Sequence, residues 1–401
     1  MKSFDLKQGL NLPFLPHSFP LEKDSSKKIF YQQDFPGLDL KVCVEEGQSI
    51  APGKILLQDK KRSDLTVKAF FTGKISTIVY GDKKKFLSLT IENIERVPWK
   101  ENFSKNPKEF FLQSTLWNLL RQRPFDIIPS PESSLENLFI QGCDSYTGES
   151  FKSIIYTKSF QEGLSFLKKV FKRVYLIGRD FADNDAYNFS GKHPSGLVGT
   201  HIHYLCPASL DKKVEHLQVE DVWTIGNFIL TGNFSLQRYL RYGKNFLQVE
   251  SFDYIDQKTD GFEFIVGHPL YGEKRLSLSP KTRHLSSVPI QKEDTNFNWL
   301  KPLKTFSITN FSVNPLDLNL SSHGEGRSFI PLDFFYEVFP LRMEVPYLLR
   351  SLLTQDEDLA IDLGILELVE EDFALLSFVD PTKHNFIERA SLLLKKIKDQ
   401  L

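Results

Sequence analysis

The chain has 401 residues, 41% of them hydrophobic, and a formal net charge of −1 at pH 7. This length exceeds what one ordinary hydrophobic core supports, so the sequence predicts about two to four domains. The near-zero charge removes the electrostatic basis for nucleic-acid binding, and the hydrophobic content excludes extensive disorder.

The three cysteines, Cys43, Cys143 and Cys206, are far apart in the chain. None belongs to a C-x-x-C pair, so the sequence contains neither a disulfide framework nor an iron–sulfur or zinc-ribbon motif, and a reducing compartment fits best. The N-terminal stretch lacks the apolar core of a signal peptide. No window approaches the roughly 18 apolar residues of a spanning helix, which leaves peripheral attachment to a membrane open.

Residues 1–100 are predicted to form a β domain. Short strands are expected at residues 40–44, 52–57, 65–75 and 86–91, separated by glycine-containing corners such as Pro52-Gly53. This pattern resembles the barrel-sandwich fold of biotinyl and lipoyl domains. In carriers of that fold a hairpin lysine is modified, and Lys60 or Lys61 would take that place here. The alternative is that both are solvated turn lysines, since the usual Met-Lys-Met or Asp-Lys-Ala tip is absent.

Residues 101–235 are predicted to form an α/β domain. Asn106-Pro107 has the pattern of a helix N-cap and first turn, and a helix is expected over residues 109–121, ending before Pro124. A second helix is expected after the capping-box spacing at residues 159–162. The apolar run at residues 173–178 then predicts a buried strand, and this succession indicates a parallel sheet.

The remainder is predicted to change from strands to helices. Residues 236–315 have a strand-like, turn-rich pattern, and residues 316–401 a helical one. Helices are expected over residues 346–352, 359–364 and 371–379, followed by a final helix capped by Asn385. The acidic residues at 367–372 are expected to form a solvated first helical turn, where the helix dipole stabilises negative charge.

Residues 193–207, HPSGLVGTHIHYLCP, contain three of the nine histidines. On a strand, His201 and His203 would face the same side and could share a metal with His193, as a metal-dependent hydrolase would require. The alternative is a structural loop followed by a strand at residues 201–205. A phosphate-binding glycine loop, a P-loop and a G-x-S-x-G nucleophile motif are all absent from the sequence, so no self-contained nucleotide or acyl-transfer site is expected.

Four stretches, taken in order, resemble the A subunit of the sodium-translocating NADH:quinone oxidoreductase. They are LWNLLRQRPF (residues 116–125), HPSGLVGTHIHYLCP (193–207), YEVFPLRMEVPYLLR (336–350) and LGILELVEEDFALLSFVDP (363–381). KQGLNLP at residues 7–13 and FIPLD at residues 329–333 also fit. Each stretch is weak alone, whereas the ordered set spans the chain.

The resemblance implies a fold and a role. It implies a barrel-sandwich domain, a Rossmann-like domain, a β-grasp module and a helical end. The family's complex uses NADH, flavins, an iron–sulfur cluster and quinone, and it couples reduction of a ubiquinone-type quinone to Na⁺ export. Its A subunit is implied to be peripheral on the cytoplasmic face of the bacterial inner membrane. It would dock on the membrane-embedded B subunit near the quinone site and bind no redox cofactor itself.

Two stretches are candidates for the face near quinone or the B subunit. In the first, comprising Arg121, Arg123, Pro124 and Phe125, a ring would stack on the quinone and an arginine would donate to its carbonyl. The alternative is a helix stop with cations that offset the helix dipole. The second comprises Phe35, Pro36 and Gly37, and its alternative is an ordinary Pro-Gly turn.

The histidine-rich stretch is interpreted as a structural loop of the family. Its members are His193, Pro194, Ser195, Gly196, Gly199, His201 and His203. Flavin-binding relatives in the Rnf complex have P-S-G-G-E-K in this place, whereas Leu197 and Val198 follow Gly196 here. Residues 233–260 are also short for the family's β-grasp module, so we expect a trimmed remnant and a divergent or second copy of the A subunit.

Overall fold

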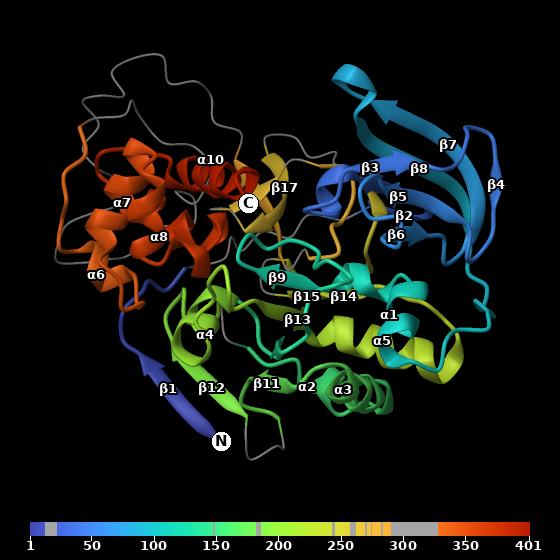
Figure 1. The fold of residues 1–401 in the computed structure, drawn as a ribbon, viewed down its shortest axis with the longest axis horizontal. Helices are drawn as coiled ribbons and strands as arrows, with labels where there is room; N and C mark the ends of the chain where they lie inside the picture. The colour runs from blue at the N-terminus through green and yellow to red at the C-terminus, as the bar shows by residue number, and fades with distance from the viewer. Residues whose placement is uncertain are drawn as a thin grey trace.

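The structure is a computed structural model that describes residues 1–12, 22–146, 149–181, 186–242, 245–256, 262–268, 271–273, 275–281, 284–289 and 328–401. Within these ranges the chain has several sheets and a helical end, which confirms the expected multidomain α/β and β fold. Figure 1 shows the barrel strands β7 and β8 on one side of the molecule and helices α7, α8 and α10 on the other.

The first part, here called the barrel, is built from two antiparallel sheets. Its strands are β2 (Glu22–Tyr31), β3 (Leu40–Val42), β4 (Ser49–Ile50), β5 (Ile55–Asp59), β6 (Thr66–Lys68), β7 (Thr72–Tyr80) and β8 (Phe86–Glu95), with short helices η1 (Gln32–Asp34) and η2 (Asp82–Lys84). Strands β2, β8, β7 and β4 form one sheet and β3, β5 and β6 the other. The expected strands are therefore present, but the run at residues 65–75 is two strands, β6 and β7, and not one.

The second part, here called the α/β part, is a six-stranded sheet in the order β1-β12-β11-β10-β13-β9. Its strands are β1 (Lys2–Leu6), β9 (Arg121–Arg123), β10 (Asn137–Gln141), β11 (Arg173–Ile177), β12 (Tyr187–Gly191) and β13 (Val214–Gln218). All are parallel except β9, which confirms the parallel sheet. Strand β1 lies at the edge of this sheet beside β12, although the first residues were expected with the barrel.

The helices of the α/β part correct two expectations. They are α1 (Pro107–Gln113), η3 (Leu116–Leu119), α2 (Lys152–Ile155), α3 (Lys158–Val170), α4 (Val198–Leu205) and α5 (Val219–Thr231). Asn106 caps α1 as predicted, but the helix ends at Gln113, because Thr115 adopts a left-handed φ of 64° and turns the chain. The expected helix over residues 109–121 is thus wrong. The cap of α3 is Thr157, which accepts from the Phe160 N–H, and not Ser159.

The stretch expected as a strand at residues 201–205 lies in helix α4 instead. Val198, Ile202 and Leu205 recur at helical spacing and contact one small apolar core with strands β10 and β12. The alternation of apolar and polar residues in THIHYL is typical of a strand. The segment is a helix because only helical spacing buries Val198, Ile202 and Leu205 together.

A third, β-rich part follows with β14 (Gln237–Tyr242), β15 (Asn245–Glu250), β16 (Asp253–Asp256), β17 (Phe262–His268), β18 (Tyr271–Glu273) and β19 (His284–Pro289). Five of these strands form a mixed sheet in the order β15-β14-β19-β17-β18, and β16 pairs with β2 of the barrel. The described residues from 236 to 289 contain no helix. Residues 290–327, which include the expected boundary at 315–316, lie outside the described residues.

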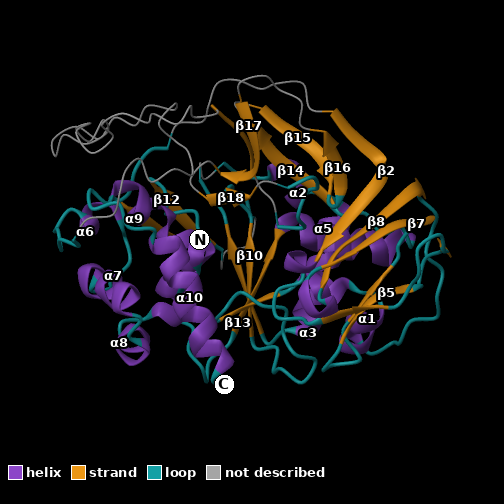
Figure 2. Cartoon of the chain, turned by 90° about the horizontal axis from the view of Figure 1, so that it is seen from above, coloured by secondary structure: helices purple, strands orange, loops and turns teal. Residues whose placement is uncertain are grey.

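The helical part at the C-terminus contains α6 (Phe335–Val338), α7 (Val345–Thr354), α8 (Glu357–Asp362), η6 (Ile365–Glu367), η7 (Glu370–Phe373), α9 (Ala374–Val379) and α10 (Phe386–Asp399). These helices share one core and confirm the predicted helical end, including the cap of α10 by Asn385, which accepts from the Glu388 N–H. Figure 2 shows α7, α8 and α10 on one side of strands β10 and β13, with the barrel on the other side. Within the ranges described, every helix is too short or too polar to cross a membrane.

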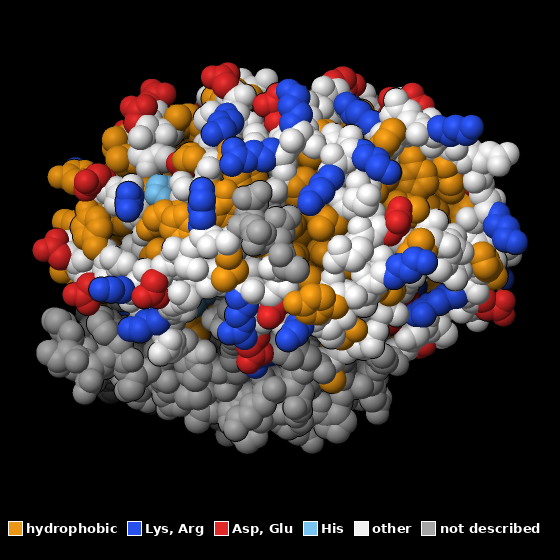
Figure 3. Space-filling model, turned by 90° about the horizontal axis from the view of Figure 1, so that it is seen from below, with side chains coloured by type: hydrophobic (Ala, Val, Ile, Leu, Met, Phe, Trp, Pro, Cys, Tyr) orange, Lys and Arg blue, Asp and Glu red, His pale blue; other side chains and the backbone are white. Residues whose placement is uncertain are grey.

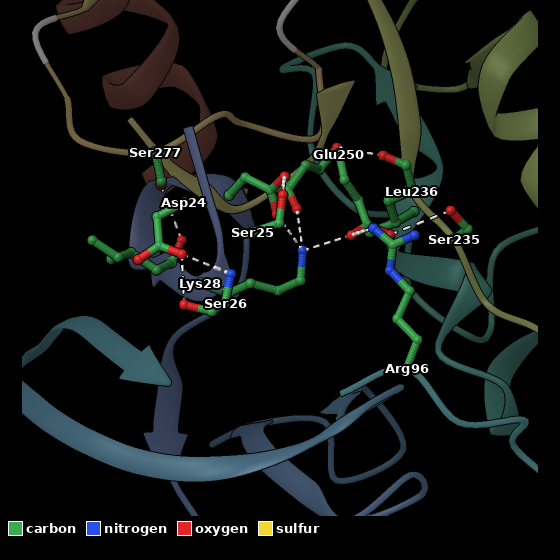
Figure 4. Close-up of polar contacts among 12 residues, drawn as sticks. Asp24, Ser25, Ser26, Lys28, Arg96, Ser235, Leu236, Glu250 and Ser277 are labelled. Carbon is green, nitrogen blue, oxygen red and sulfur yellow. Dashed lines mark hydrogen bonds and ion pairs between the residues drawn. The ribbon is translucent and has the colours of Figure 1, made fainter. Parts of the chain in front are cut away.

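A buried cluster of charges joins the barrel to the β-rich part (Figure 4). Lys28 on β2 is 1% exposed, and its Nζ donates to Glu250 at 2.9 Å and to Asp253 at 2.7 Å. Arg96 donates to the same Glu250 carboxylate at 2.6 Å. Burial acts to raise the pKa of Glu250, but Lys28 and Arg96 outweigh it and hold that pKa below its ordinary value. Two cations therefore neutralise two buried carboxylates.

Replacing Lys28 with Met should lower the free energy of unfolding by about 3–5 kcal/mol, because Asp253 would lose its cation and Glu250 would keep only Arg96. The matched control is Lys27→Met, which breaks the more exposed 3.3 Å ion pair with Glu92 and should change stability by less than about 1 kcal/mol. Urea unfolding of both variants measures the difference. Equal destabilisation of the two variants would show that the buried cluster does not hold these parts together.

Candidate functional site

The two stretches predicted as an interface lie side by side. The N–H of Ile128 donates to the carbonyl of Pro36 at 3.0 Å, and a Cβ on Gly37 would lie 2.7 Å from the Cβ of Ile127. Phe35 is 4% exposed and stacks on Phe252 of the β-rich part, with ring centroids 6.2 Å apart. Three parts of the chain therefore meet at this place.

Arg121 is a buried member of this junction and lies on β9, not at a helix end. One Nη donates to the carbonyls of Asn118 and Leu120 at 2.8 and 2.9 Å, and the other donates to that of Asp34 at 3.0 Å. The expected helix-dipole role of this arginine is wrong, because β9 is an extended strand paired with β13. Its guanidinium instead fixes the backbone of the barrel against that of the α/β part.

Arg123 connects the α/β part to the helical part. Its Nη1 donates to the carbonyl of Glu367 at 3.1 Å and lies 3.4 Å from the Asp372 carboxylate, while its Nε lies 3.3 Å from Asp126. Asp126 also accepts from His216 Nε2 at 2.6 Å. Burial acts to raise the pKa of Asp126, but His216 and Arg123 outweigh it and keep the carboxyl ionised.

The remaining members of this predicted stretch differ in exposure. Pro124 is buried, whereas Phe125 is half-buried and packs against the core of the helical part. In the second stretch, Pro36 and Gly37 are also half-buried. Phe125, Pro36 and Gly37 are therefore the members that reach the surface, and the two arginines lie behind them.

The histidine-rich loop packs on the loop that follows β10. The His193 ring is 3% exposed and stacks on Tyr146, with centroids 4.4 Å apart and planes 8° apart. Burial lowers the pKa of His193 to about 3, so the ring is neutral. Gln141 Nε2 donates to the Gly196 carbonyl at 2.6 Å, and a Cβ on Gly196 would lie 2.6 Å from the Ser145 carbonyl oxygen. The two loops leave no gap between their backbones here.

His201 and His203 do not face the same side, because they lie two residues apart on helix α4. His201 Nε2 is 3.0 Å from the Ser195 carbonyl, and burial lowers its pKa to about 3. His203 Nε2 accepts from the Arg342 N–H, so its Nδ1 carries the proton that is donated to Glu367 at 2.7 Å. The premise of the metal-hydrolase alternative is thus wrong. Within the described ranges, no three His, Cys, Asp or Glu side chains are grouped to hold a metal.

The acidic stretch at residues 367–372 is packed against the α/β part, so the expected solvated turn is wrong. Asp372 is 4% exposed, and Tyr146 OH donates to Glu371 at 2.8 Å. A Cβ on Gly199, in the first turn of α4, would lie 2.6 Å from the Asp372 carboxylate. We refer to the whole set as the polar seam: Arg123, Asp126, Tyr146, His203, Glu367, Glu371 and Asp372.

The sequence alone indicated Arg123, His203 and the acidic run of the polar seam but not their pairing. Asp126 and Tyr146 were missed altogether. Both follow strands of the α/β sheet, β9 and β10, that were not predicted from the sequence, so no signal in the sequence pointed to either residue. Their partners in the helical part are remote in sequence, since Glu371 lies 225 residues after Tyr146.

The pH dependence of stability should identify Glu371. Burial chiefly raises its pKa to about 7 from an ordinary value of 4.5. The folded chain therefore holds this proton more tightly, and the stabilisation is complete below pH 4.5 and lost as pH rises through about 7. In Glu371→Gln, urea unfolding from about pH 5 to about pH 8 should show a smaller loss of stability than in the parent chain. Parallel pH profiles for the two proteins would contradict this assignment.

Two family models match the chain, and both describe domains of the same family. A family model described as the NqrA N-terminal barrel-sandwich hybrid domain matches residues 4–94, and one described as the NqrA second alpha/beta domain matches residues 104–234. Together these two models cover the barrel and the α/β part.

Similar proteins match over nearly the whole chain. The A subunit of the Na(+)-translocating NADH-quinone reductase of Actinobacillus succinogenes is 29% identical over 441 residues, covering 98% of this chain and 99% of that protein. The protein of the same name from Haemophilus influenzae is 28% identical over 448 residues, with the same coverage. Both alignments are longer than the 401 residues of this chain, so these relatives contain segments that it lacks. The two family models and the end-to-end matches show that the chain belongs to the NqrA family, the A subunits of the Na(+)-translocating NADH-quinone reductases.

Proposed function

We propose that the chain is a peripheral subunit on the cytoplasmic face of a membrane-bound complex that reduces quinone with NADH and exports Na⁺. The observation that carries this proposal is the match, along 98% of the chain, to relatives named as the A subunit of such a reductase. We further propose four domains at residues 1–100, 101–235, 236–315 and 316–401. Strand β1 belongs to the first range in sequence but lies in the sheet of the second domain.

We propose that this subunit holds no redox cofactor of its own. The loop corresponding to the flavin-binding loop of Rnf relatives is filled by the chain itself. The Ser145 carbonyl lies over Gly196, and the Asp372 carboxylate lies over Gly199 at the start of α4. The Asp372 carboxylate thus occupies the space beside the first turn of α4, where it accepts from the Val369 N–H and from Arg123. NADH, flavins, the iron–sulfur cluster and quinone would then belong to the other subunits.

We propose that the surface formed by Phe125, Pro36 and Gly37 faces the membrane-embedded B subunit near its quinone. Phe125 offers an aromatic ring that is half-buried and still accessible. Arg121 and Arg123 act behind it as positioning residues, because their guanidinium donors are used within the chain. This narrows the predicted quinone contact from an arginine and a ring to the ring alone.

Phe125→Ala tests this surface in the assembled complex. We expect the variant to fold, and we expect a roughly tenfold loss in affinity for the membrane subunits or a tenfold rise in the KM for quinone. The chain is pulled down from detergent-solubilised membranes, and quinone is titrated against NADH oxidation. The control, Tyr156→Ala, removes a 58% exposed ring from the α/β part. Unchanged assembly and unchanged quinone dependence in Phe125→Ala would remove this surface from the proposal.

A lipoyl-like carrier is the second candidate, favoured by the exposed turn that bears Lys60 and Lys61 after β5. Lys60 Nζ is ion-paired with Asp39 at 2.9 Å, as a structural lysine would be. The intact mass of the chain purified from its native cells decides between the two. An adduct on either lysine would favour a carrier, and an unmodified mass would favour the subunit.

A further inference from the structure

The β7–β8 hairpin ends in a tip that combines exposed apolar side chains with exposed lysines. Figure 1 shows this hairpin extending away from the rest of the molecule. Val79, Tyr80 and Leu87 are 41%, 49% and 44% exposed. We infer that this tip is a contact site for a membrane surface containing anionic phospholipids.

The apolar part of the tip is held on a firm base. Phe86 and Leu89 of β8 are 1% and 0% exposed, so the strand is anchored in the barrel core. Leu87, which lies between them in sequence and is exposed, packs across the turn, with its Cδ1 3.2 Å from the place of a Cβ on Gly81. The exposed leucine thus belongs to an ordered hairpin and adjoins the lysine-bearing turn.

The turn carries three consecutive cations, Lys83, Lys84 and Lys85, against one acid, Asp82, and all four are exposed. Within the part of the chain that the structure describes, none of the three ammonium groups has a carboxylate at ion-pair distance. Their charges are therefore available to an external partner.

The backbone of the turn makes these lysines unfavourable for folding alone. Lys83 and Lys84 have φ values of 54° and 57°, in the left-handed region. Tight hairpin turns of this hand favour Asn and Gly, because a side chain on Cβ crowds the following carbonyl. Lysine at both positions makes the turn less stable than Asn-Gly would. We therefore relate the lysines to binding of an external partner and not to folding.

Anionic lipid is the partner that fits both features. Lysine ammonium groups near a membrane surface are attracted to anionic headgroups, while their aliphatic stems and a tyrosine ring suit the headgroup–acyl boundary. An acidic protein patch would satisfy the lysines but not the three apolar side chains. The tip also differs from the face of the molecule seen in Figure 3, where apolar patches are surrounded by both acidic and basic side chains.

The inference shares with the proposed function only the nearness of a membrane, so vesicle binding is measured on the purified chain alone and capture by the solubilised membrane subunits is measured separately. Flotation with vesicles of phosphatidylcholine, with and without phosphatidylglycerol, measures binding. In Lys83→Gln/Lys84→Gln/Lys85→Gln, binding to the anionic vesicles should fall on the order of 100-fold. The matched control is Lys158→Gln/Lys168→Gln/Lys169→Gln, which removes three lysines from α3 and should leave binding unchanged.

A second set of variants tests insertion of the apolar side chains. Val79→Thr/Tyr80→Thr/Leu87→Thr keeps strand-forming residues and all charges, and it should weaken binding most at high salt, where lysine attraction is screened. In Tyr80→Trp, the added fluorescence should shift to the blue with anionic vesicles. Thermal unfolding of every variant checks that the barrel is intact.

Three outcomes would overturn the inference. They are equal binding by the hairpin and α3 variants, equal binding to neutral and anionic vesicles, and loss confined to capture by the solubilised membrane subunits. The third would identify an acidic protein partner instead of lipid. Failure of the chain to capture any membrane subunit, with vesicle binding retained, would contradict the proposed function and leave this inference standing.

Discussion

The contact between the α/β sheet and the helical part depends on the buried guanidinium of Arg123. It bridges a carboxylate from its own turn, Asp126, and a carboxylate and a carbonyl from the helical part, Asp372 and Glu367. Burying a charge is costly unless it is paired and hydrogen-bonded, so these groups are tolerable only when all are present together. The two parts are therefore fixed in one relative orientation, and the loops carrying Tyr146 and His193 are enclosed between them.

The same principle recurs at the barrel, where Lys28 and Arg96 meet Glu250 and Asp253. An apolar interface allows neighbouring parts to slide at little cost, whereas a buried ion cluster is satisfied at one position only. We interpret both clusters as devices that specify arrangement more than they add stability. A rigid arrangement is what a subunit would contribute to a larger complex.

Periodicity and capping residues predicted the elements that are stabilised by contacts near in sequence. Apart from β2 and β4, the barrel strands were expected, as were β11 and the helices around Pro346 and Asn385, and all of these are present. Strand β9 could not be predicted, because three residues pair with β13 across about 90 residues of sequence. Helix α4 was misread because its histidines alternate with apolar residues. The contacts of the polar seam could not be predicted for the same reason as β9, because the residues involved meet only when distant segments pack. The family was recognised from ordered motifs, which survive at 29% identity where single residues do not.

Strand β1 carries a consequence for the order of events during synthesis. Its partner β12 is synthesised about 180 residues later. Strand β2 of the barrel pairs with β16, which is synthesised more than 200 residues after it. Strand edges that lack partners are open to pairing with other chains. The nascent chain thus exposes two such edges until its middle has left the ribosome, so early termination would release an aggregation-prone fragment even though the barrel core itself is already encoded.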